Sequence, residues 1–74
     1  MQKLRFEYRV ESNGTEVFIS FGVGGMGGSV CGNSRKLAMT ELVELAQDYI
    51  AHEGRTDSVW RNVRSTDDLD FVEM

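Results

Sequence analysis

Residues 3–23 read KLRFEYRVESNGTEVFISFGV, a stretch in which apolar and polar side chains alternate on both sides of one Asn-Gly pair. A period of two predicts β-strands with one dry face and one wet face. Asn-Gly favours a type I′ turn, because that turn needs positive φ at both of its central residues. The stretch therefore predicts a β-hairpin over residues 2–23 that turns at Asn13 and Gly14.

A two-residue loop at Asn13 and Gly14 also predicts the register of the hairpin. Each apolar residue of the first strand then lies opposite an apolar residue of the second, which a slip of one residue would destroy. On the wet face, Phe18 is expected opposite Arg9. The expected apolar pairs are Val10–Val17, Tyr8–Ile19, Phe6–Phe21 and Leu4–Val23.

The composition is typical of one small folded domain spanning residues 1–74. The chain is 41% hydrophobic and has a net charge of −4, which disfavours unspecific binding to nucleic acid. A single cysteine excludes an intramolecular disulfide, and homodimerisation is an open alternative at this size. Without a signal peptide or a long apolar run, a cytoplasmic protein with no membrane span is expected.

Residues 22–33 are rich in glycine and contain formal matches to nucleotide-binding spacings, including Gly22-Val-Gly24-Gly25-Met-Gly27. Those motifs need a parallel βαβ unit, whereas the preceding strand belongs to an antiparallel hairpin. We therefore expect no cofactor. Two interpretations stay open: a passive connector, or a partner-binding loop that displays Met26 among its few side chains.

The rest of the chain predicts a main helix and a third strand. Helical spacing begins at about residue 34 or 40 and ends near residue 53. Either Asn33 or Ser34 could cap the earlier start, and Thr40 is the favoured cap of the later one. In the segment 56–74, Thr56 or Asp57 would cap a short second helix, followed by a strand from Leu69. The predicted fold is α+β, ββα(α)β, with an antiparallel sheet of order 2-1-3 packed on the helix by its dry face.

The residue types that carry catalysis are scarce. Cys31 and His52 are the single cysteine and histidine, and nothing in the sequence fixes their distance or supplies a third, orienting group. No spacing resembles a zinc or calcium site. We therefore predict no catalytic residues, no metal site and no enzymatic activity.

Two surfaces are candidates for binding a macromolecule. Arg5, Arg9 and Phe18 on the wet face, together with Met26, form an expected protein interface, because an aromatic among arginines is typical of interface hot spots. The same face is the alternative site for nucleic acid. The second surface is the acidic C-terminal segment, which could imitate spaced phosphates and contains Asp67, Asp68, Asp70 and Glu73.

The sequence thus predicts a small non-enzymatic protein that acts through protein–protein interaction. Its size and acidity are similar to those of phage-encoded anti-defence proteins such as anti-CRISPRs, although no motif matches one of them. Inhibition of a nucleic-acid-handling enzyme is the narrower expectation, and a nucleic-acid-binding module is the alternative.

Overall fold

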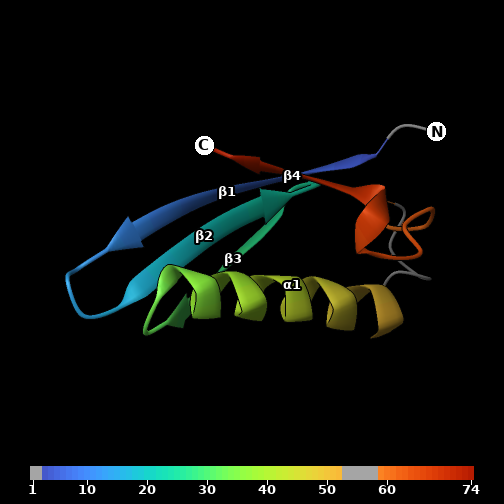
Figure 1. Cartoon of the computed structure of the whole chain (residues 1–74). Helices are drawn as coiled ribbons and strands as arrows, with labels where there is room; N and C mark the ends of the chain where they lie inside the picture. Colours follow the sequence, from blue (N-terminus) through green and yellow to red (C-terminus); the bar gives the residue numbers. More distant parts are fainter. Residues whose placement is uncertain (1–2, 53–58) are drawn as a thin grey trace.

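The computed structural model describes residues 3–52 and 59–74, which form one sheet with one long helix on one of its faces (Figure 1). This arrangement confirms the predicted α+β class. The elements in chain order are β1 (Leu4–Ser12), β2 (Val17–Val23), β3 (Met26–Gly32), α1 (Arg35–His52), the short 3-10 helix η1 (Thr66–Asp68) and β4 (Leu69–Glu73).

The sheet has four strands in the order β3-β2-β1-β4. The last strand lies next to β1 as predicted, but the two are parallel, so the expected antiparallel sheet of order 2-1-3 is wrong. The reason is the additional strand β3, which pairs antiparallel with β2. It reverses the chain once more before α1, so that β3 runs in the direction of β1 and α1 runs back toward the end of the sheet where β1 begins. Strand β4 therefore starts from that end, parallel to β1.

The β1–β2 hairpin has the predicted faces but a different register. Val10 pairs with Ile19 and Tyr8 with Phe21, so each partner lies two residues beyond the predicted one. The loop is four residues long because the Asn13 side chain organises it: Asn13 Oδ1 accepts hydrogen bonds from the backbone N–H of Thr15 (3.0 Å) and of Glu16 (2.8 Å). A shift of two residues leaves every side chain on its face.

The glycine-rich segment forms a strand, so neither a passive connector nor a displayed loop describes it. Gly24 and Gly25 have φ of 56° and 85° and close a tight turn between the paired residues Val23 and Met26. Two further glycines are required by packing. A Cβ at Gly28 would lie 2.9 Å from Phe21 Cζ, and one at Gly32 would lie 2.8 Å from the backbone nitrogen of Ala38.

Helix α1 begins at Arg35 rather than at the favoured Thr40. Ser34 Oγ accepts a hydrogen bond from the Leu37 N–H at 3.2 Å, the geometry of an N-cap, so the alternative start is the correct one. The predicted end of the helix near residue 53 and the predicted caps Thr56 and Asp57 lie outside the described residues. Residues 59–62 form a turn, not the predicted short helix.

The core lies between the sheet and α1, on the dry face that the alternation predicts. The Phe6 ring stacks on Phe21 at 5.3 Å and lies 4.9 Å from Phe71, while Trp60 packs against Tyr49 at 4.7 Å. These aromatic contacts join the sheet, the helix and the segment after the helix. The buried residues are Phe6, Ile19, Val23, Ala38, Leu42, Ala46, Trp60, Val63 and Leu69.

Candidate functional site

The open face of the sheet holds three of the predicted interface residues. Arg5, Arg9 and Phe18 all lie on the face that α1 does not cover, as their positions in the strand pairing show. Phe18 is 39% exposed. However, it lies opposite Glu11 and not opposite Arg9, because of the changed register. The expected pairing of an aromatic ring with an arginine is therefore wrong.

Charges of both signs alternate along this open face. Arg5 Nε lies 3.0 Å from Glu7 Oε2, and Asp70 of β4 is the pairing partner of Arg5 in the sheet. Arg9 likewise stands between the two glutamates Glu7 and Glu11 along β1. Binding of a phosphate backbone needs a surface that is positively charged throughout. The described part of this face carries both signs and does not offer such a surface.

Met26 lies on the opposite side of the sheet from the other three predicted interface residues. It pairs with the buried Val23 and packs against the core. Because paired residues in a sheet share a face, Met26 faces the α1 side. The predicted set Arg5, Arg9, Phe18 and Met26 is therefore not one surface.

The four C-terminal acids are also separated. Asp68 Oδ2 accepts a hydrogen bond from the Arg64 N–H at 2.9 Å, and Asp67 donates its own N–H to Ser65 Oγ. Asp70 lies on the open face beside Arg5. Glu73 forms an ion pair with Arg35 at the start of α1. Two of the four carboxylates thus bond within the fold, and the set does not form one acidic strip.

Cys31 and His52 are not brought together. Cys31 lies on β3 shortly before α1, whereas His52 is the last residue of that helix. At about 1.5 Å per residue, the helix alone separates its two ends by roughly 25 Å. Within residues 3–52 and 59–74, no three side chains of the His, Cys, Asp or Glu type are placed to share a metal ion.

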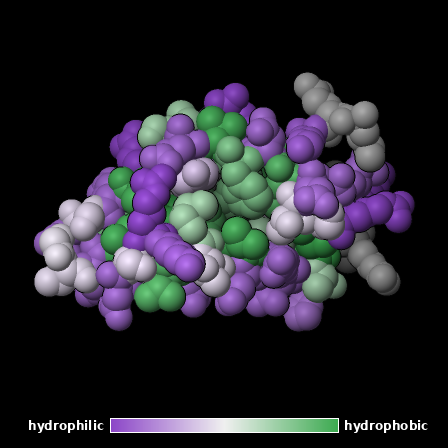
Figure 2. Space-filling model, viewed as in Figure 1, coloured by the Kyte–Doolittle hydropathy of each residue, from purple (hydrophilic) through white to green (hydrophobic). Residues whose placement is uncertain are grey.

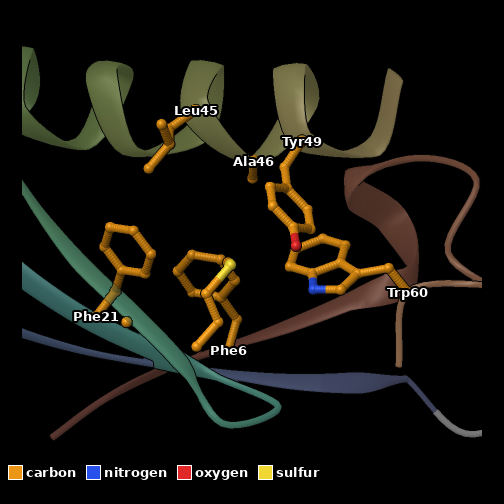
Figure 3. A pocket seen from close by; sticks show the side chains of 8 residues that line it. Phe6, Phe21, Leu45, Ala46, Tyr49 and Trp60 are labelled. Atoms are coloured by element: carbon orange, nitrogen blue, oxygen red, sulfur yellow. The ribbon is translucent and has the colours of Figure 1, made fainter. Parts of the chain in front are cut away.

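The structure instead forms an apolar pocket of about 150 Å³ between the sheet and α1 (Figure 3). Phe6 and Phe21 rise from the sheet, Leu45, Ala46 and Tyr49 descend from the helix, and Trp60 closes one end. Each wall comes from a different part of the chain. The lining residues are Phe6, Phe21, Met26, Gly27, Leu45, Ala46, Tyr49 and Trp60.

Small residues keep this pocket open to the surface. Gly27 lines it without a side chain, and the half-buried Phe21 ring lies directly against the neighbouring Gly28. Leu45 stands at the mouth and is 40% exposed. Figure 2 shows hydrophobic side chains gathered in the middle of this side of the molecule, with hydrophilic side chains around them. Within residues 3–52 and 59–74, the pocket is thus a part of the core that other side chains leave open.

The pocket lies beside a free strand edge. Strand β3 has β2 as its one neighbour in the described sheet. In a two-residue turn, the flanking residues Val23 and Met26 form a hydrogen-bonded pair. Along an antiparallel ladder, hydrogen-bonded pairs then alternate with pairs whose N–H and C=O groups point outward. The N–H and C=O groups of Gly27, Ser29 and Cys31 therefore point away from the sheet.

The two edges of the sheet differ in how they are protected. Natural proteins guard edges with charged side chains, proline or bulges. The edge strand β4 carries Asp70 and Glu73, and the latter is held by Arg35. The sequence of β3 is MGGSVCG, with no charge, no proline and little side-chain bulk. Its backbone is accessible to another strand.

Sequence reasoning missed this site because it treated the glycines as a loop. Gly24-Gly25 between two apolar residues is itself a hairpin signal. The alternation of Met26, Gly28, Val30 and Gly32 on one face could have suggested the third strand, although glycine hides the pattern.

Comparisons with protein-family models, with curated proteins and with solved structures find no match to this chain. Among the described residues, no helix is both long enough and apolar enough to cross a bilayer.

Proposed function

We propose that this chain is a non-enzymatic protein-binding module that receives an extended segment of a partner protein along β3. The observation that carries the proposal is the unprotected β3 edge directly beside an open apolar pocket. Strand addition is a common mode of recognition, in which the backbone supplies affinity and pockets for alternate side chains supply specificity.

The fold offers both features of this recognition mode, namely free backbone groups and a pocket for a side chain. The outward backbone groups of Gly27, Ser29 and Cys31 match the groups that an incoming strand offers. The pocket takes one aliphatic or aromatic side chain of that strand, and complete burial of such a side chain contributes about 1.5–3 kcal/mol. Trp60 and Tyr49 form part of the wall and make it rigid and aromatic.

Inhibition of a nucleic-acid-handling enzyme is a narrower proposal within this one, supported by the net charge of −4 alone. Direct binding of nucleic acid by the open face has less support. Glu7, Glu11 and Asp70 stand among its arginines, and Phe18 is the one aromatic residue there in the described strands.

Two exposed hydrophobic residues allow a matched test. Leu45 borders the pocket and Phe18 lies on the open face, and their exposed fractions are 40% and 39%. Random displayed peptides are selected for binding to the folded protein. The affinity of each selected peptide is then measured from the fluorescence of Trp60, the single tryptophan. We expect Leu45→Ala to weaken binding by about tenfold or more, or roughly 1.4 kcal/mol, and Phe18→Ala to leave it within about twofold.

The opposite ranking would refute the proposal. If Phe18→Ala weakens the selected peptides and Leu45→Ala does not, the open face is the interface. Circular dichroism of both variants serves as the folding control, since each side chain is partly exposed and its loss should leave the fold intact.

A further inference from the structure

We infer that the segment bound along β3 is basic, with the pattern basic–X–apolar–X–basic centred on the residue that enters the pocket. This inference rests on the proposed function and specifies the partner of the same site. It follows from the side chains that α1 places along the free edge.

One side of α1 carries Leu37, Glu41, Leu45 and Asp48 at spacings of four, four and three residues. Side chains at these spacings lie on the same side of a helix. All four residues are exposed. Because Leu45 borders the pocket, this side of the helix is the side on which the pocket opens. Glu41 and Asp48 therefore flank the mouth of the pocket.

This row follows the β3 edge along its length. At one end, a Cβ at Gly32 would lie 3.0 Å from Leu37 Cβ, so the end of β3 touches the start of the row. At the other end, Gly27 and Leu45 line the same pocket. Figure 1 shows β3 and α1 running in opposite directions past one another. A strand added to β3 would thus have α1 beside it.

The spacing of the acids suits the repeat of a strand. Along the helix axis, the step of four residues from Leu45 to Glu41 spans about 6 Å, and the step of three residues from Leu45 to Asp48 spans about 4.5 Å. In a strand, alternate side chains on one face are about 6.6–6.8 Å apart. When one side chain occupies the pocket, the side chains two residues before and after it face Glu41 and Asp48. The pattern reads the same in either strand direction.

The acids have no basic partner within the described part of the fold. The ion pairs there join Arg5 to Glu7 and Arg35 to Glu73, and none involves Glu41 or Asp48. A nearby third carboxylate, Glu44, is also exposed on α1 and raises the negative potential. A lysine or arginine of the partner would supply the missing charge.

The same row disfavours a second copy of this chain as the occupant. A two-fold axis perpendicular to the sheet, which would pair β3 antiparallel with β3, would place both helices on the same face of the joined sheet, side by side. Glu41 and Asp48 of each copy would then approach those of the other, and facing like charges are destabilising. A basic segment fits the edge better than a copy does.

The test uses three capped peptides of the form Thr-Z-Thr-Leu-Thr-Z-Thr, in which Z is lysine, glutamine or glutamate. Dissociation constants are measured from Trp60 fluorescence at low and at high salt. We expect the lysine peptide to bind about tenfold or more tightly than the glutamate peptide at low salt, with glutamine between them. The difference should shrink at high salt because exposed charges are screened.

Charge-reversed variants locate the effect. Glu41→Lys/Asp48→Lys should reverse the order of the peptides. The matched control Glu7→Lys/Glu11→Lys makes the same change in net charge on the open face and should preserve the order. Reversal by both pairs, or by the control alone, would overturn the inference, since the selectivity would then come from net charge or from another surface.

Failure of the inference and failure of the proposed function give different results. Leucine-dependent binding with equal affinity for all three peptides overturns the basic pattern and leaves strand addition in place. Absence of leucine-dependent binding for every peptide at millimolar concentration overturns the proposed function itself. The replacement of the central leucine by threonine provides this comparison for each peptide.

Hydrogen exchange tests whether the peptide binds as a strand. Protection of the Gly27, Ser29 and Cys31 amides on addition of the lysine peptide supports the inference, and unchanged exchange with binding preserved overturns it. Analytical ultracentrifugation tests whether a second copy of this chain occupies the edge instead. A dimer that Ser29→Pro dissociates would overturn the inference in favour of a second copy, because proline removes an outward N–H of β3.

Discussion

The turn between β2 and β3 offers a sharp test of the fold, because its two glycines differ in their surroundings. Gly24 and Gly25 both have positive φ, which L-residues with a side chain adopt at a cost. A Cβ at Gly24 would lie 2.4 Å from Val59 Cγ1, whereas one at Gly25 meets nothing within 4 Å. A comparison of Gly24→Ala with Gly25→Ala therefore separates the cost of backbone strain from the cost of the steric clash with Val59.

The losses of unfolding free energy in the two variants should differ only by the cost of the steric clash with Val59. Gly25→Ala carries the left-handed strain of about 1–2 kcal/mol. Gly24→Ala carries the same strain and adds an overpacking cost of about 1–3 kcal/mol against Val59. The free energy of unfolding should therefore fall by about 2–5 kcal/mol in Gly24→Ala, a large fraction of the stability of a small domain.

Urea denaturation followed by Trp60 fluorescence measures both values. In the double variant Gly24→Ala/Val59→Ala, removal of the Val59 methyl groups should recover about 1–3 kcal/mol of coupling, whereas Gly25→Ala should add to Val59→Ala within about 0.5 kcal/mol. Equal destabilisation by the two single variants, with no coupling to Val59, would refute the packing of this turn against the segment after α1.

Other predictions concern the cap of α1, the turn between β1 and β2, and the two residues whose types could carry catalysis. Ser34→Ala should lower the free energy of unfolding by about 1 kcal/mol, and an equal loss in Thr40→Ala would contradict the assignment of Ser34 as the cap. Gly14→Val should cost at least about 1–2 kcal/mol in the same urea assay, since φ at Gly14 is 97°; an unchanged midpoint would contradict that conformation. Cys31→Ser and His52→Gln should each leave peptide affinity and any biological activity nearly intact. A loss of several orders of magnitude with folding preserved would instead indicate catalysis.

The faces of the strands and the position of the helix follow from the sequence. Alternation in residues 3–23 assigns Phe6 and Ile19 to the core and Arg9 to the open face, and the structure keeps these assignments. The helical spacing likewise places Leu42 and Ala46 in the core. These features are local, because the direction of a side chain depends on the backbone of its own element.

The register, the third strand and the direction of β4 do not follow from the alternation of apolar and polar residues. The four-residue loop depends on the bonds of the Asn13 side chain, which compete with the two-residue turn that Asn-Gly favours. Strand β3 depends on the fit of Gly28 under the Phe21 ring and of Gly32 against Ala38. Glycine has no side chain to reveal such a fit in the sequence.

The candidate site belongs to this second group. Met26 was predicted to act together with Phe18, but one added strand places it on the other side of the sheet, in the wall of the pocket. Leu45 and Trp60 read as ordinary core residues in a helical or short apolar pattern. Only tertiary packing decides that they border an opening, because the opening exists where small residues of one segment fail to cover the aromatic rings of another.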